Sequence, residues 1–232
     1  MKAIWLAPSA CLLLCLVCLG CGGEPKFDKK PLSRWTAQLQ NENPDIRRAA
    51  AMTLSKNSAE AKKAIPELVK ALQDKDPVTR STVASTLGKM GTDAASAVPN
   101  LVKLLQDGDS DVRRVSTQTL GVLAKAGADA KAAVPGLVTL LQDKAPACRR
   151  AAADTLAVTA KSGAEAKAAV PALTKSLLDM EPTVRASAAR ALGQMGQEAK
   201  PAVPNLVRLL QDGDADVRSA AAEAYKKIEQ KK

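Results

Sequence analysis

Apolar residues recur through most of the chain at the spacing of an α-helix. In a representative stretch they fall at positions i, i+3, i+4 and i+7, which places them on one helix face. A second stripe of the same kind follows a short polar segment. The first stripe contains Val98, Leu101, Val102 and Leu105, and the second contains Val112, Ser116, Leu120 and Leu123. The pattern predicts two consecutive helices joined by a turn, with Asp109 or Ser110 capping the second helix.

This helix pair recurs along the chain. Each second helix carries an arginine near its start, and an aspartate or asparagine lies six residues before that arginine. The arginines are Arg47, Arg80, Arg113, Arg149, Arg185 and Arg218, separated by 33, 33, 36, 36 and 33 residues. Self-similarity at this period predicts an all-α fold, an α-solenoid of about six helix-pair repeats. The approximate units are 32–64, 65–97, 98–133, 134–169, 170–202 and 203–232.

Proline and glycine punctuate the repeats. A proline opens five of the units and costs little there, because the amides of a first helical turn have no partner within the helix. These prolines are Pro66, Pro99, Pro135, Pro171 and Pro204. Glycines are expected at weakened helix ends or at turns between repeats. They are Gly88, Gly91, Gly121, Gly127, Gly163, Gly193 and Gly196.

The two 36-residue steps are the irregular part of the array. Their three extra residues amount to nearly one helical turn, and they fall around 122–125 and 158–161. We expect a longer second helix or a longer turn in the third and fourth repeats. One hypothesis is that this segment, with Arg114, Gln118, Arg150 and Asp154, is the centre of a contact surface. The alternative is a tolerated insertion.

The recurring pattern resembles the HEAT-like repeats of bacteria, the group that includes the phycobilin-lyase type. The matching residues are Asp107, Arg113, Leu120, Gly121, Gly127, Ala130, Ala133, Val134, Pro135 and Leu137. The resemblance covers about residues 32–232. The unit departs from eukaryotic HEAT repeats in being shorter than their ~40–47 residues.

The resemblance implies a structural role for the aspartates and arginines. In this family they line the turn between helices and tie one repeat to the next, since a guanidinium can bond a carboxylate and backbone carbonyls together. A stripe of anion-binding arginines is the functional alternative. We call the series the ladder; it comprises Asp74, Arg80, Asp107, Arg113, Asp143, Arg149, Asp179, Arg185, Asp212 and Arg218.

Residues 1–31 do not follow the repeat pattern. Lys2 precedes an apolar stretch that is too short for a comfortable membrane span of about 20 residues and that ends in Cys18-Leu19-Gly20-Cys21. This resembles a bacterial lipoprotein signal, which implies a signal peptide at 1–20, lipidation of Cys21 and a tether at 21–31. Cys18 is atypical, because leucine is usual at that position. An uncleaved signal-anchor and a plain secretory signal remain alternatives. The expected location is the bacterial cell envelope, periplasmic or outer-surface.

The sequence offers little for catalysis. It contains no histidine, which removes the commonest general base and metal ligand. The acids recur at matching positions of every repeat, whereas a catalytic pair should be a local exception. Four of the five cysteines precede residue 22, and Cys148 is expected to be a buried small residue. We therefore expect no enzyme, no catalytic residue, no metal and no cofactor.

A more favourable binding surface lies one, five and nine residues after each ladder arginine, on a stripe facing away from the apolar side of the second helix. In solenoids of the resembled type these helices line the concave side. The eighteen positions include seven basic and two acidic residues, and they vary between repeats, as a recognition surface or a merely solvated face would. The candidate binding residues are Arg48, Arg114, Gln118, Val122, Arg150, Asp154, Val158 and Arg190.

The net charge of +10 favours partners of negative potential. Nucleic acid is disfavoured, because export removes the chain from the chromosome and few aromatic residues are available for stacking. The predicted function is a non-enzymatic, membrane-anchored interaction scaffold that binds an acidic protein. The alternatives are an enzyme accessory such as a chromophore lyase, by analogy of fold alone, and nucleic-acid binding. The large residues Trp35 and Tyr225 are expected to cap the two ends of the array.

Overall fold

A computed structural model describes residues 32–56 and 61–230. The chain divides into two compact units, Met1–Lys30 and Pro31–Lys232, and the described residues belong to the second. Cys21, the signal sequence and the tether therefore lie outside the described residues. No strand occurs within 32–56 and 61–230, which confirms the all-α prediction. None of the helices described there is both long enough and apolar enough to span a membrane.

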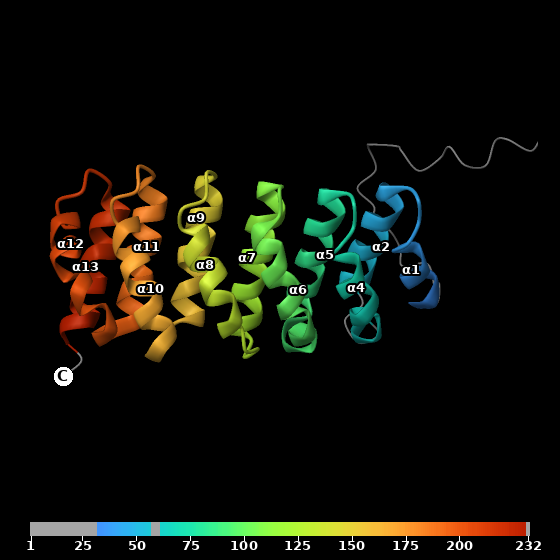
Figure 1. Ribbon diagram of the computed structural model, residues 1–232, viewed down its shortest axis with the longest axis horizontal. Coiled ribbons are helices and arrows are strands. Elements are labelled where there is room, and N and C mark those ends of the chain that lie inside the picture. Colours follow the sequence, from blue (N-terminus) through green and yellow to red (C-terminus); the bar gives the residue numbers. More distant parts are fainter. Residues whose placement is uncertain (1–31, 57–60, 231–232) are drawn as a thin grey trace, which may run out of the picture. The chain divides into compact units, whose positions relative to one another are not determined.

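The described helices form two layers of consecutive pairs (Figure 1). The layer of first helices contains α1 (Leu32–Gln38), α4 (Ile65–Ala71), α6 (Val98–Lys103), α8 (Val134–Leu140), α10 (Gly163–Ser176) and α12 (Val203–Leu209). The layer of second helices contains α2 (Pro44–Lys56), α5 (Pro77–Lys89), α7 (Ser110–Lys125), α9 (Pro146–Thr159), α11 (Pro182–Met195) and α13 (Ala215–Glu229). Short 3₁₀ segments lie at Lys62–Ala64, Gly91–Ala97, Leu104–Gln106, Lys131–Ala133 and Gly196–Ala202.

The core is continuous from repeat to repeat. Leucines of both layers fill it, among them Leu101, Leu120 and Leu137, each with no exposed surface. Burying such a side chain contributes roughly 1.5–3 kcal/mol before entropy costs. Each second helix packs on the second helices of its neighbours through small residues such as Ala84 and Ala153. No helix pair in the described residues could bury this surface alone, so the stack is the unit of stability.

The three extra residues of the two 36-residue repeats lie in different places. In the third repeat α7 is 16 residues long, against 13 in α5, so the insertion extends the second helix. In the fourth repeat α9 has 14 residues, as α11 has, and the added residues lie in the turn before α10. Pro171, expected to open a unit, instead lies inside α10. The other four prolines occupy the first turn of α4, α6, α8 and α12.

The glycines are of two kinds. Gly91, Gly127, Gly163 and Gly196 have positive φ and mark the turns between repeats. Gly88, Gly121 and Gly193 instead lie inside helices and are buried, where a neighbouring helix comes very close. Gly88 and Gly193 lie in the last turn of α5 and α11, as expected of helix ends, whereas Gly121 lies further inside α7.

The end caps agree only in part with expectation. Trp35 packs partly buried against the core. The Tyr225 side chain is 39% exposed, although the leucines at the same position of the preceding repeats are buried. Tyr225 is therefore more exposed than those leucines.

Candidate functional site

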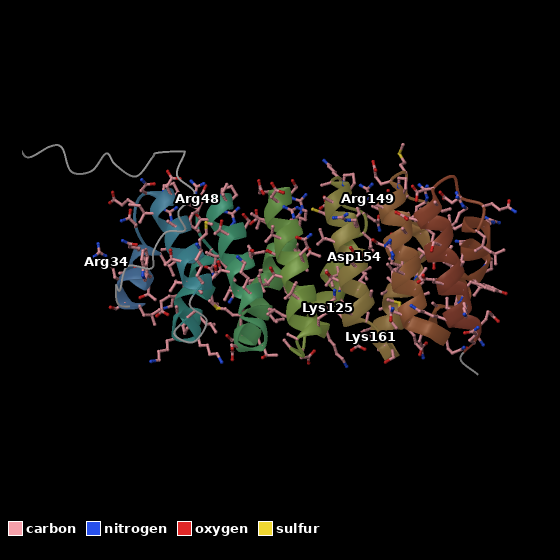
Figure 2. The ribbon with its side chains drawn as sticks, turned by 180° about the vertical axis from the view of Figure 1, so that it is seen from behind. Arg34, Arg48, Lys125, Arg149, Asp154 and Lys161 are labelled. Atoms are coloured by element: carbon pink, nitrogen blue, oxygen red, sulfur yellow. The ribbon has the colours of Figure 1, made fainter. Side chains whose placement is uncertain are left out.

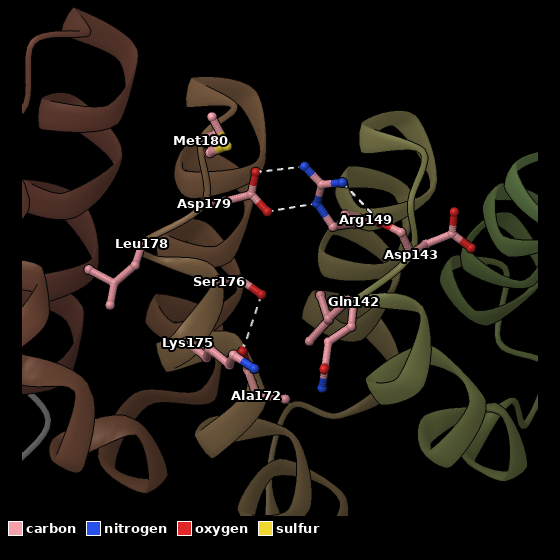
Figure 3. Close-up of a pocket in the computed structure, with 10 residues that line it drawn as sticks. Gln142, Asp143, Arg149, Ala172, Lys175, Ser176, Leu178, Asp179 and Met180 are labelled. Atoms are coloured by element: carbon pink, nitrogen blue, oxygen red, sulfur yellow. Dashed lines mark hydrogen bonds and ion pairs between the residues drawn. The ribbon is translucent and has the colours of Figure 1, made fainter.

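The ladder residues join each repeat to the next. Arg149 of α9 donates from Nε and Nη2 to the two carboxylate oxygens of Asp179, at 2.7 and 2.8 Å, as Figure 3 shows. The same two-bond pairing links Arg47 to Asp74, Arg80 to Asp107, Arg113 to Asp143 and Arg185 to Asp212. Arg47 was placed in the arginine series but not in the ladder, and it belongs there.

Each ladder residue also bonds within its own repeat. The Nη1 of Arg149 donates to the carbonyl oxygen of Asp143 at 2.9 Å, and a carboxylate oxygen of Asp179 accepts from the backbone amide of Glu181 at 2.9 Å. The arginine and aspartate side chains of these pairs are 5–16% exposed. A guanidinium whose donors are used in this way has little capacity left for a ligand. The geometry favours the structural role over an anion-binding stripe.

The last ladder arginine is the exception. Nη1 of Arg218 donates to the carbonyl oxygens of Asp212 and Gly213, at 2.7 and 3.0 Å. Within the described residues no following aspartate receives its other donors. Arg218 therefore forms the hydrogen bonds to carbonyls of its own repeat but, within the described residues, not the pairing with an aspartate of a following repeat.

The ladder shifts the pKa values of its own members. Burial raises the pKa of the Asp107, Asp143 and Asp179 carboxyls, but the hydrogen bonds from arginine and backbone amide outweigh it, and each pKa lies below the ordinary 3.8. The hydrogen bond from Arg185 is the main cause of the lowered pKa of Asp212. Conversely, the hydrogen bond to Asp143 raises the pKa of Arg113.

We expect the protein to lose stability in acid. A carboxyl whose pKa is lower in the folded chain than in the unfolded chain contributes stability above its unfolded pKa, and this is lost as the pH falls through its folded pKa. The melting temperature measured by circular dichroism should therefore fall below about pH 4. Asp179→Asn, which keeps the shape without the charge, should make this fall smaller. A melting temperature that is constant or rising from about pH 6 to about pH 3 would contradict the prediction.

The second-helix stripe is mainly solvent-exposed. Gln118, Arg150, Asp154 and Arg190 are exposed, and Val122 is 48% exposed. Arg48, Arg114 and Val158 are half-buried. Ala186, placed on the stripe by spacing, is buried, so the stripe is interrupted at α11. Figure 2 views the molecule from the side opposite to Figure 1. Arg48 and Arg149 lie near one edge of the array, and Lys125 and Lys161 lie near the opposite edge.

The candidate binding residues do not converge on one place. Arg48 forms an ion pair with Asp45, and Arg114 bonds Asp111 at 3.0 Å and Gln118 at 3.2 Å. Both arginines thus neutralise acids of their own helix. A hollow of about 260 Å³ brings together three other candidates, Arg150, Asp154 and Arg190.

That hollow also contains acids from the last repeat. Asp214 and Asp216 line it, together with Pro182 and Ser187. Asp214 caps α13 by accepting from the amides of residues 216 and 217. Arg150 and Arg190 form no ion pair within the described residues. The hollow therefore offers two cationic donors beside carboxylates and is of mixed charge.

Sequence reasoning missed a second series of contacts between second helices. Buried threonine hydroxyls donate to backbone carbonyls of the preceding repeat: Thr86 to Ala51, Thr119 to Ala84 and Thr155 to Thr117, at 3.0–3.2 Å. The signal was a threonine six residues after four of the arginines, Arg47, Arg80, Arg113 and Arg149. These bonds fix neighbouring helices along their length, and they too are structural.

The remaining chemistry is sparse. Cys148 is fully buried, as expected, and burial raises the pKa of its thiol, which makes it a poor nucleophile. No group of three or more metal-ligating side chains occurs among the residues that the structure describes.

The tied stack of helix pairs defines the protein as an α-solenoid, a class in which neighbouring repeats share one core. The family described as HEAT repeats matches residues 32–121, 98–180 and 170–232. The chain belongs to this family, which confirms the HEAT-like prediction.

Solved structures show the same architecture. Two engineered proteins are 27% and 25% identical to this chain, with TM-scores of 0.70 and 0.71, over 85% and 86% of this chain and 96% and 98% of theirs. The complex of CpcE and CpcF of phycocyanin lyase from Nostoc contains a chain that is 27% identical, with a TM-score of 0.61, over 87% of this chain and 79% of that one. A search of curated proteins gives no match.

Proposed function

We propose that the protein is a non-enzymatic interaction scaffold, held in the bacterial cell envelope by a lipid on Cys21, whose second-helix face binds an acidic protein. The observation that carries the binding proposal is the pair of exposed arginines in the hollow of that face, Arg150 and Arg190, which form no ion pair with any residue that the structure describes. The residues at these two positions differ from repeat to repeat, whereas the ladder residues recur.

The distribution of paired and unpaired charge supports an acidic partner. At the start of α2, α5 and α7 the acids are already engaged: Asp45 and Asp111 are bound by Arg48 and Arg114, and Asp76 and Asp109 cap helices. At the other end, Lys56, Lys89, Lys125 and Lys161 are exposed and form no ion pair within the described residues. The uncompensated charge along α2, α5 and α7 is therefore positive, which attracts partners of negative potential.

The packing supports the choice of face. The second helices pack on one another more extensively than the first helices do. Such packing is expected of the inner layer of a curved stack, and solenoids present extended binding surfaces on that concave side.

Reversing the two arginines should abolish partner binding without unfolding the array. We expect Arg150→Glu with Arg190→Glu to reduce recovery of the partner from envelope extract at least about tenfold, because an attraction becomes a repulsion. Lys167→Glu with Lys200→Glu, two exposed lysines outside the hollow, is the charge-matched control. Equal recovery by the arginine variant and wild type would contradict the proposal.

The anchor is tested separately. Radiolabelled palmitate should be incorporated by the wild-type chain and not by Cys21→Ser, and the variant should leave the membrane fraction. Labelling that persists in Cys21→Ser would contradict lipidation at this residue.

The similarity to the CpcE–CpcF complex of phycocyanin lyase favours a second candidate, an accessory of chromophore attachment. That function requires an interaction with phycobilin, so it predicts a change in pigment absorbance when protein is added. The scaffold function predicts an unchanged spectrum.

A further inference from the structure

The connection between α10 and α11 departs from the other repeats at two positions. Leu178 stands where the other five repeats have glutamine, namely Gln40, Gln73, Gln106, Gln142 and Gln211. Met180 stands where they have Glu42, Lys75, Gly108, Lys144 and Gly213. Figure 3 shows these two residues on either side of Asp179. In one repeat, therefore, a polar turn has become apolar.

These two side chains do not serve the core. Leu178 is 69% exposed and Met180 is 93% exposed, whereas the adjoining Leu177 is completely buried. The other repeats form the same turn and the same ladder pairing with polar residues at these positions. Folding therefore does not explain an exposed leucine and methionine here, and exposed apolar groups gathered at one place mark contact sites.

A groove lies beside them. Leu178 and Met180 line a hollow of about 470 Å³ together with Leu141, Ala172 and Lys175. A second hollow of about 590 Å³ contains Leu105, Val138 and Lys144. The two hollows share Gln142 and Asp143, so they adjoin across neighbouring repeats, and together we call them the turn groove.

The free charges of the groove are positive. Its carboxylates, Asp107, Asp143 and Asp179, are held by ladder arginines. Lys144 and Lys175 are exposed and form no ion pair within the described part of the chain. The exposed Glu181 adjoins Met180 but does not line either hollow. The groove thus combines apolar surface with two available ammonium groups.

We propose that this turn groove docks a short acidic segment of a partner protein, with large apolar side chains packing against Leu178 and Met180. Carboxylates of the same segment pair with Lys144 and Lys175. The complementarity of charge selects an acidic segment over a basic one, and the exposed leucine and methionine select an apolar anchor over a purely polar peptide. Methionine suits such a site because its flexible side chain adapts to the partner's shape.

This site extends the proposed scaffold function and rests on it only in assuming a protein partner. It lies on the turns between first and second helices, among residues that do not include Arg150 or Arg190. Variants can therefore test the two surfaces independently.

The probe is a short fluorescein-labelled peptide in which leucine and phenylalanine are interspersed with glutamate, titrated against the full chain by fluorescence anisotropy. We expect Leu178→Gln with Met180→Gln, which replaces both apolar side chains with uncharged polar ones, to weaken binding at least about tenfold. Lys144→Gln with Lys175→Gln should weaken binding and reduce its dependence on salt. A peptide with lysine in place of glutamate, and one with serine in place of the apolar residues, should bind less well.

Matched variants control for composition and fold. Lys167→Gln with Lys200→Gln removes two exposed lysines elsewhere, Met52→Gln removes an exposed methionine of α2, and both should bind the peptide as wild type does. All variants should retain the wild-type melting temperature, because the replaced side chains lie outside the core. Undetectable binding by wild type, equal binding by wild type and Leu178→Gln with Met180→Gln, or loss only in the Arg150 and Arg190 variant would overturn the site. A wild-type dimer in light scattering that this turn variant dissociates would also overturn it, in favour of self-association.

Discussion

Replacing Arg113 with alanine is expected to lower the free energy of unfolding by about 3 kcal/mol. The Arg113 side chain is only 16% exposed and its partner Asp143 only 9%. Removing the guanidinium leaves a mostly buried carboxylate without its counter-charge. It also leaves the carbonyl oxygens of Asp107 and Gly108 without the donor that now bonds them at 2.8 and 3.1 Å. Loss of one partner from such a pair costs more than the pair itself contributes to stability, because the remaining charge stays poorly solvated.

The chain contains a matched control for this experiment. Arg218→Ala removes the same residue type from the same position of a repeat, and it breaks two bonds to carbonyls but no pair with a following aspartate in the described residues. Its effect on stability should be clearly smaller. Urea unfolding followed by circular dichroism measures both variants, and equal effects would show that the link between repeats contributes nothing.

The ladder variant also separates stability from binding. At a temperature where it remains folded, Arg113→Ala should bind a partner of the Arg150 and Arg190 hollow as wild type does, because neither Arg113 nor Asp143 lines that hollow and the nitrogens of Arg113 bond within the stack. Normal stability with lost binding would instead restore the anion-binding interpretation of the arginine series.

Why the sequence predicts the ladder and not the Thr119 contact is a matter of periodicity. The arginine and the aspartate recur together from one repeat to the next, so their constant spacing indicates a structural role that every repeat shares. Threonine occupies its position in only some repeats, and the hydroxyl of Thr119 reaches the carbonyl of Ala84 only because two helices approach closely. The distance between two packed helices depends on tertiary packing, so it cannot be predicted from the spacing of residues along one helix.

The exposed surface was harder to predict for a different reason. Spacing along a helix gives direction, and it correctly placed Arg150 and Arg190 outside the core. It does not give the neighbours, so the acids Asp214 and Asp216 beside Arg190 were not anticipated. Leu178 carried a signal that was present but unused. Leu178 is an apolar residue at a position where the other repeats have glutamine, and comparing only the polar residues of the repeats does not reveal it.

Replacing Gly193 with valine is the second change with a large expected effect, a loss of about 3 kcal/mol of stability. A Cβ atom at Gly193 would lie 2.8 Å from the Cα of Ala224 and 3.1 Å from its Cβ. The nearest atom is backbone, so no side-chain rotation relieves the clash, and α11 and α13 must separate. Separation also loosens the leucines beneath the two helices, which makes the cost larger than a local strain.

Gly108→Val provides the comparison, because no heavy atom lies within 4 Å of a Cβ built at Gly108. Both variants introduce the same side chain and remove the same backbone freedom from the unfolded chain, so the difference between them isolates the crowding at α13. Gly193→Ala should fall between wild type and Gly193→Val, since alanine favours the helix by about 1 kcal/mol over glycine while its Cβ still meets Ala224. If Gly193→Val unfolds in urea at the same midpoint as Gly108→Val, helix contact is not the reason for glycine at this position.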